Sequence, residues 1–294
     1  MTRSDDAIRR PPTGRLVVCP TPIGNLRDVT LRVLDTLREA DLIACEDTRR
    51  TRTLLDRYEI EGRLVSFHEH NERERAAELL SRIQGGSTVA LLSDAGMPLI
   101  SDPGYALVRA CVRAGVALEV LPGPSSVLTA LVASGMPAER WCFVGFLPRR
   151  QAELEQMLLE EPDTLVAFEA PRRVVASLTA LAESQPGRPV AVCRELTKLH
   201  EEIRRGSARE LADHYREHPP RGEVALVIGA SPAGAPVDFE RAIRLLRELV
   251  QAGAKPRPAA GVISELTGVP VNELYRELTD EPDLLDERDL ADDA

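Results

Sequence analysis

The sequence has few aromatic residues: Phe, Trp and Tyr together make up 3% of its 294 residues. Hydrophobic residues nevertheless reach 43%, which is ordinary for a globular protein. The core must therefore be built from Leu, Val, Ala and Ile. A chain of this length is typical of two domains, with or without an appendage.

Cysteine pairs and metal-binding clusters are also lacking. The five cysteines include no Cys-x-x-Cys pair, are odd in number, and mostly lie in apolar stretches. This pattern is typical of small buried residues in a reducing cytoplasm. His68 and His70 could share one strand face, but zinc sites usually need three or four ligands. We therefore expect a cytoplasmic protein without a metal site.

No uninterrupted apolar run approaches the ~20 residues that a membrane-spanning helix needs. Residues 1–13 are charged, Pro-rich and without the apolar centre of a signal peptide, so we expect a disordered leader. Residues 280–294 carry −7 of the formal net charge of −10, and we expect a disordered acidic tail. The remaining chain, with its Arg clusters, is close enough to neutral to allow a nucleic-acid partner.

Three common signatures of α/β enzymes are missing. The sequence contains no GxGxxG dinucleotide fingerprint, no GxxxxGK[ST] phosphate-binding loop and no GxSxG nucleophile elbow. What remains is a series of loops at the ends of expected strands, rich in Pro, Gly, Ser and carboxylates. These loops lie at 20–28, 46–49, 67–71, 93–104 and 122–126.

Strand-like and helix-like segments alternate through residues 14–122. Short aliphatic runs predict strands at 15–19, 42–45, 64–67, 88–92 and 117–121. The alternation predicts an N-terminal α/β domain with a mostly parallel sheet covered on both faces.

A second α/β domain is expected over residues 123–232, with strands near 142–146, 164–168, 189–193 and 223–229. Residues 237–279 have helical spacing and predict a small helical module. Its last two segments have the pattern of a helix-turn-helix, and a plain helical hairpin fits equally well because the two share turn chemistry.

The loop Ser93–Gly104, SDAGMPLISDPG, follows an expected strand and precedes a helical segment. In open α/β sheets, ligands bind at the carboxyl ends of the strands. Gly allows close backbone approach, and Asp can accept hydrogen bonds from ribose hydroxyls or cap the next helix. The loop is therefore either a ligand site or a well-capped turn.

Taken together and in order, the loop sequences are distinctive: PTPIGNLRD, ACEDTRRT, FHEHNE, LLSDAGMPLISDPG, LPGPSS, GFLPR, FEAPRR and RELTKLHEE. They resemble the tetrapyrrole methylase superfamily of methyltransferases, which use S-adenosyl-L-methionine (SAM). The combination of CPTPIGNL, EDTR, HEHN and RELTK resembles its ribosomal branch in particular. That branch 2′-O-methylates a cytidine in the decoding region of 16S rRNA, and the resemblance covers residues 14–279.

The resemblance implies two α/β domains with SAM in the cleft between them, a homodimer, and the small ribosomal subunit as partner. The residues that it implies for cofactor binding are Ile23, Gly24, Asp94, Gly96, Met97, Ser125, Ser126, Phe168 and Ile228. Ser125 could also be only a helix cap, and Phe168 could be plain core. Within Ser101–Gly104 we expect mostly the start of the next helix.

Transfer of a methyl group to a ribose hydroxyl needs a base, because the protonated hydroxyl is a poor nucleophile. The main candidates are Glu46, Glu69 and, if its pKa is lowered, Lys198; Asp47 and Glu169 remain alternatives. The candidate residues for RNA phosphates are Arg49, Arg52 and Arg172. Each carboxylate could instead cap a helix or pair with an Arg.

Two other functions remain open. One is a tetrapyrrole methylase of the same fold, which should lack the Arg-rich EDTRRTR segment and the C-terminal helices. The other is a ribosome-binding factor that has lost catalysis, which should have eroded cofactor loops.

Overall fold

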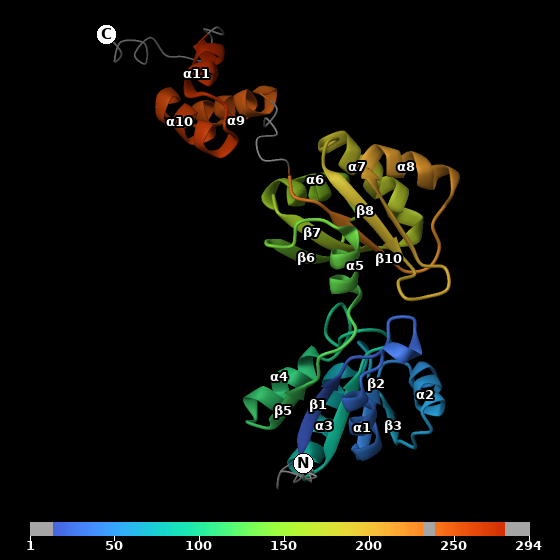
Figure 1. The fold of residues 1–294 in the computed structure, drawn as a ribbon. Helices are drawn as coiled ribbons and strands as arrows, with labels where there is room; N and C mark the ends of the chain where they lie inside the picture. The colour runs from blue at the N-terminus through green and yellow to red at the C-terminus, as the bar shows by residue number, and fades with distance from the viewer. Residues whose placement is uncertain (1–13, 232–238, 280–294) are drawn as a thin grey trace, which may run out of the picture. The chain divides into compact units, whose positions relative to one another are not determined.

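The computed structural model describes residues 14–231 and 239–279. The predicted leader and acidic tail therefore lie outside the described residues. The chain divides into two compact units, one ending at Ala230 and the other beginning at Ser231 (Figure 1). In the part of the chain that is described, no helix combines the length and the apolar character needed to cross a membrane.

The first sheet of the larger unit is entirely parallel, with strand order β3-β2-β4-β1-β5. This confirms the parallel sheet that the alternating sequence pattern predicts. Its strands are β1 (Arg15–Cys19), β2 (Leu42–Cys45), β3 (Leu64–Ser66), β4 (Thr88–Leu92) and β5 (Ala117–Val120). Because all run the same way, the loops that follow them meet at one edge of the sheet.

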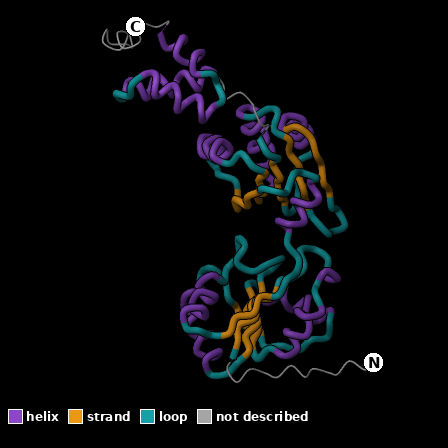
Figure 2. The backbone as a smooth tube through the Cα atoms, turned by 60° about the vertical axis from the view of Figure 1, so that its left-hand side comes forward, coloured by secondary structure: helices purple, strands orange, loops and turns teal. Residues whose placement is uncertain are grey.

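Helices cover both faces of this sheet (Figure 2). One face packs against α1 (Leu31–Glu39) and α2 (Thr48–Arg57), and the other against α3 (Glu72–Gln84) and α4 (Tyr105–Arg113). The short helix η1 (Leu26–Asp28) follows β1. Alternate residues of each strand enter opposite apolar clusters, as the period-2 geometry of a strand requires.

The second sheet is mixed, with strand order β6-β7-β10-β8-β9. Only β6 and β7 pair in parallel, whereas β10 runs antiparallel to both of its neighbours. The strands are β6 (Trp141–Phe146), β7 (Thr164–Glu169), β8 (Pro189–Arg194), β9 (Glu202–Ser207) and β10 (Val224–Ile228). Strand β9 is absent from the sequence-based prediction, because its sequence EIRRGS is largely polar, as an edge strand permits.

The two faces of the second sheet are covered differently. One carries α6 (Gln151–Glu160), η2 (Pro171–Arg173), α7 (Val174–Ser184) and α8 (Ala208–Glu217). The opposite face packs against α5 (Ser126–Ser134) and also against Ile23, which comes from the loop after β1. One apolar cluster therefore joins the loop after β1 to the second sheet.

A fully buried guanidinium, that of Arg188, lies at the end of the second sheet where β7 begins and β10 finishes. Arg188 donates hydrogen bonds to the carbonyl oxygens of Leu158, Glu161, Asp163 and Gly229, at 2.6–3.1 Å. Buried polar groups need such partners because desolvation is costly. This one side chain satisfies four backbone acceptors around the ends of α6 and β10.

The smaller unit consists of three helices among the described residues, α9 (Phe239–Gln251), α10 (Pro256–Thr267) and α11 (Val271–Thr279). They pack around Ile243, Leu246, Ile263 and Leu274. Gly268 ends α10 in the left-handed conformation that glycine adopts readily. The described part of the segment 237–279 is therefore helical, as its spacing predicts.

Candidate functional site

A cavity of about 320 Å³ lies between the strand-end loops of the first sheet and the second sheet. Met97 and Asp102 line it from the loop after β4, and Ser125 lines it from the start of α5. Phe168 and Val224 line it from β7 and β10. Residues far apart in the sequence thus enclose one space, which we refer to as the cavity.

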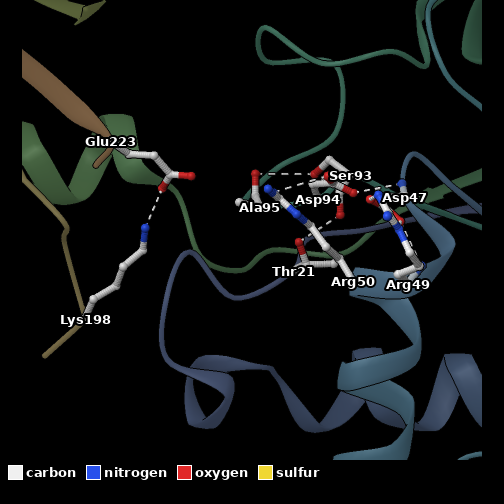
Figure 3. Close-up of polar contacts among 9 residues, drawn as sticks. All are labelled: Thr21, Asp47, Arg49, Arg50, Ser93, Asp94, Ala95, Lys198 and Glu223. Atoms are coloured by element: carbon white, nitrogen blue, oxygen red, sulfur yellow. Dashed lines mark hydrogen bonds and ion pairs between the residues drawn. The ribbon is translucent and has the colours of Figure 1, made fainter. Parts of the chain in front are cut away.

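Backbone hydrogen bonds fix the loop after β4 to the loop after β1. Thr21 and Gly96 exchange two N–H···O bonds of 2.9 Å each. The Thr21 hydroxyl also donates to the Ser93 carbonyl oxygen at 3.1 Å (Figure 3). Gly96 has a φ of 79°, a conformation that glycine tolerates best. These bonds hold the Gly96–Met97 backbone at the cavity wall.

Six of the residues that the sequence assigns to the cofactor line this cavity. They are Ile23, Gly96, Met97, Ser125, Ser126 and Phe168. The Ser125 hydroxyl also accepts a hydrogen bond from the Leu128 N–H at 3.4 Å, so it caps α5 as well as lining the cavity. Phe168 makes edge-to-face contacts with two other Phe rings, which builds an aromatic wall.

Ile228 does not line the cavity, so its assignment to the cofactor has no support from the cavity geometry. Because β10 is antiparallel to β7, Val224 pairs with Glu169, and Ile228 pairs with Leu165 at the opposite end of the sheet. Ile228 is buried in the core beneath the helices of the second sheet. The start of β10, rather than its end, reaches the cavity.

Asp94 lies beside the cavity lining and is engaged by other protein groups. Its carboxylate accepts the Asp47 N–H at 2.9 Å and forms an ion pair with Arg50 at 3.3 Å (Figure 3). It therefore links the loop after β4 to the start of α2. A contact between Asp94 and the cofactor stays a prediction.

Lys198 is held by two carboxylates. Its ammonium lies 2.9 Å from Glu195 Oε1. It also lies 3.0 Å from Glu223 Oε2 (Figure 3). Burial pushes the pKa of Lys198 down, but the hydrogen bonds to Glu195 and Glu223 outweigh it and raise the pKa above its ordinary value. The condition of a lowered pKa that was attached to this candidate is therefore not met, and a role of Lys198 as the base stays a prediction.

The carboxylate candidates Glu46 and Glu69 do not line the cavity either. Glu46 is partly buried after β2, and burial, followed by the charge of Asp94, raises its pKa. Glu69 is exposed on the loop after β3. A direct catalytic role for either remains a prediction without support from the cavity geometry.

The Arg candidates lie at two places on the surface. Arg49 forms an ion pair of 2.7 Å with Asp47, and its hydrogen bonds lower the pKa of that carboxyl to about 2. Arg52 is exposed on the same helix. Arg172 is exposed in η2, directly after Pro171 of the cavity wall. Of the three Arg candidates for RNA phosphates, Arg172 is thus the one whose preceding residue lines the cavity.

Sequence reasoning gave little weight to Asp102, which lines the cavity. Ser101–Gly104 was expected mostly to begin the next helix. Instead, Glu72 of α3 accepts hydrogen bonds from the N–H groups of Gly104 and Ala106, at 3.0 and 2.7 Å, and so caps α4. The Asp102 carboxyl is consequently left facing the cavity.

Solved methyltransferases share this fold. The uroporphyrin-III C-methyltransferase from Thermus thermophilus, in a structure with S-adenosyl homocysteine, is 22% identical with a TM-score of 0.53, covering 74% of this chain and 97% of that one. The cobalt precorrin-4 methyltransferase CbiF is 19% identical with a TM-score of 0.56, covering 73% and 94%.

The family is defined by sequence. The profile described as "Tetrapyrrole (Corrin/Porphyrin) Methylases" matches residues 15–212, and the chain belongs to this family. Relatives named "Ribosomal RNA small subunit methyltransferase I" are 45% identical in Mesorhizobium japonicum, over 95% of this chain and 96% of that protein, and in Micromonospora olivasterospora, over 90% and 87%.

Family membership confirms the predicted cofactor class, and the cavity lining fits it. SAM needs an apolar wall for its adenine and hydrogen-bonding groups for its ribose and methionine parts. Ile23, Met97 and Phe168 would supply the first, and Ser125 with the Gly96–Met97 backbone would supply the second. The residues that line the cavity are therefore compatible with SAM, and their contact with it stays a prediction.

Gly24 permits close contact between the loop after β1 and the segment that carries Leu196 and Lys198. A Cβ atom there would lie 2.4 Å from Lys198 Cγ and 2.9 Å from the Leu196 carbonyl oxygen. We predict that Gly24→Ala weakens SAM binding by about tenfold or more, since the clash with backbone cannot be relieved by a side-chain rotation. Isothermal titration calorimetry with SAM measures this effect.

Gly187→Ala is the matched control, because a Cβ there meets no atom within 4 Å. It should bind SAM like the original protein. Unchanged affinity in Gly24→Ala would contradict the close packing of these two loops.

Proposed function

We propose that the protein transfers a methyl group from SAM to the ribose 2′-hydroxyl of a cytidine in the decoding region of 16S rRNA. The observation that carries this proposal is 45% identity, over 95% of the chain, to a relative whose name states a ribosomal RNA substrate. The nucleotide and the 2′-oxygen rest on the motif combination CPTPIGNL, EDTR, HEHN and RELTK. Ribosomal RNA as substrate implies a cytoplasmic enzyme.

The cavity residues would contribute mainly by positioning. SAM, when bound, supplies a methyl group already activated by a positively charged sulfur. Met97, Ser125 and Phe168 would hold the cofactor, and other residues of the cavity wall would orient the ribose hydroxyl beside it. Removal of the hydroxyl proton is the one chemical task left to a side chain.

A basic groove adjoins the cavity and supports an RNA substrate. We use this name for the surface lined by Arg172, Arg216 and Arg221, which shares Pro171 and Gly222 with the cavity wall. Arg216 pairs with Asp213, whereas Arg172 and Arg221 form no ion pair with the other described residues. Exposed Arg side chains of this kind contact phosphates and position the RNA without reading its sequence.

The proposal is tested with radiolabelled SAM and three acceptors: intact small subunits, free 16S rRNA and a porphyrinogen. We expect label in the ribosomal RNA, recovered as 2′-O-methylcytidine after digestion to nucleosides. Label only in the porphyrinogen would indicate a tetrapyrrole methylase. Tight subunit binding with no label in any acceptor would indicate a binding factor without catalysis.

The basic groove is tested in the same assay by the double variant Arg172→Ala, Arg221→Ala. Loss of two phosphate contacts should raise KM for the RNA and reduce the slope of log affinity against log salt by about 1 to 2. The control is Arg63→Ala with Arg73→Ala, which removes two exposed Arg side chains from the first sheet's domain. Equal effects of both double variants would exclude the groove as a specific RNA site.

We also propose that the protein is a homodimer. Strand β5 is an edge strand, and exposed apolar side chains gather on it and on the following helix α5. Val120 is 54%, Leu128 is 51% and Val132 is 79% exposed. Exposed edges and apolar patches of this kind are typical of protein–protein interfaces.

The dimer is tested by sedimentation velocity at micromolar concentration. We predict a dimer for the original protein and a monomer for the double variant Val120→Lys, Leu128→Glu, because two charges would be buried at the interface. Leu266→Glu, at a 74% exposed position in the helical unit, should remain a dimer. A monomeric original protein, or a dimeric double variant, would contradict this proposal.

A further inference from the structure

Three carboxyl groups line the cavity, and two of them are neutralised by partners. Glu169 accepts hydrogen bonds from the Ser177 hydroxyl at 2.5 Å and the Ala170 N–H at 2.7 Å, and it lies 3.4 Å from the Arg173 guanidinium. Glu223 pairs with Lys198 at 3.0 Å. Both carboxylates are therefore engaged by other protein groups.

Asp102 is the third carboxyl group, and it has no such partner. Among the described residues, no cation forms an ion pair with it. The charged groups that act on it are the carboxylates of Glu46, Asp94 and Glu223, and its hydrogen-bonding partner is the neutral Ser93 hydroxyl. The cavity thus contains one carboxyl group whose charge the protein leaves uncompensated.

The loop that carries Asp102 is held in a strained conformation. Leu99 and Ser101 have φ values of 74° and 63°, in the left-handed region that non-glycine residues avoid. Gly104 follows at a φ of 135°, where a Cβ would lie 2.8 Å from a Leu99 methyl carbon. Strain of this kind is retained where the surroundings fix a functional geometry. Because Glu72 caps α4, the Asp102 carboxyl is not needed for that purpose.

The environment of Asp102 also suits it to exchange protons. Burial, followed by the charge of Glu46, raises the pKa of Asp102 to about 7; Asp94 and Glu223 add to this, and the Ser93 hydrogen bond opposes it. A base works best when its pKa lies near the working pH, because it is then both deprotonated and a good proton acceptor.

We propose that Asp102 is the general base that removes the proton from the substrate hydroxyl. The inference rests on the proposed function. The proton moves from the hydroxyl to a carboxylate oxygen of Asp102 as the hydroxyl oxygen bonds to the methyl carbon. The electron pair of the broken carbon–sulfur bond stays on sulfur, and the Asp102 proton is later lost to water.

The activity test compares Asp102→Asn with the original protein on small subunits. The amide cannot accept the proton, so kcat should fall about 100-fold or more, while SAM affinity by calorimetry stays unchanged. In the original protein log kcat should rise with pH up to about 7 and then level off, because the ionised carboxylate is the active form. The remaining activity of Asp102→Asn should lack this rise. Asp35→Asn, an exposed carboxyl on α1, should keep the original kcat and pH profile.

A second readout needs no substrate. Since folding raises the pKa of Asp102, the folded state holds the extra proton between about pH 4 and 7, and this carboxyl makes folding less favourable as pH rises through that range. Asp102→Asn removes the penalty. It should therefore melt at a higher temperature than the original protein at about pH 8, with the difference vanishing near pH 4.

Each outcome is decisive. An Asp102→Asn variant with normal kcat, or with the original pH profile, would overturn the assignment. So would a variant that loses SAM binding or melts lower at pH 8, since Asp102 would then serve the structure. Absence of RNA methylation by the original protein would instead overturn the proposed function, which separates the two failures.

Discussion

The paired hydrogen bonds between Thr21 and Gly96 are the constraint on which the site depends. They join loops that follow two neighbouring parallel strands, and they fix the Gly96–Met97 backbone at the cavity wall. The same loop after β1 places Ile23 in the apolar cluster of the second sheet. One short bridge therefore ties the parallel sheet, the cavity and the mixed sheet together.

The carboxylates around the cavity fall into two groups, those that are paired with a cation and Asp102. Most acids near the site are matched by a nearby base: Asp47 by Arg49, Asp94 by Arg50, Glu169 by Arg173, and Glu223 by Lys198. Such pairs fix loops, and their members have little capacity left for a ligand. Asp102 differs from them because it lines the cavity and forms no ion pair with a cation among the residues that the structure describes. On this account the rigid pairs define the geometry and the unpaired carboxyl performs the chemistry.

The sequence was most informative where local pattern decides structure. Alternating strands and helices predict a parallel sheet, and a residue such as Ser125, in the loop that follows a strand, is expected at the ligand-binding edge. Local pattern does not reveal geometry that depends on pairing between remote segments. Ile228 lies outside the cavity lining because β10 runs antiparallel to its partners, which the sequence alone does not show. Asp102 was undervalued because the residue that caps α4 lies about thirty residues earlier, at Glu72.

Lys198 illustrates the same limit for electrostatics. Its sequence context shows a Lys near a strand end, but its pKa depends on Glu223, which is brought to it by the antiparallel pairing of β8 and β10. Motif resemblance was able to identify the loops that build the site. It could not show which of their charged side chains are already paired.

A crystal structure with S-adenosyl homocysteine tests the central claim most directly, namely that the cavity beside the Thr21–Gly96 bridge is the cofactor site. The account predicts the ligand in the cavity, in contact with Met97, Ser125 and Phe168, with Asp102 beside the sulfur. A ligand bound in the basic groove, or anywhere that leaves these residues without contact, would contradict it.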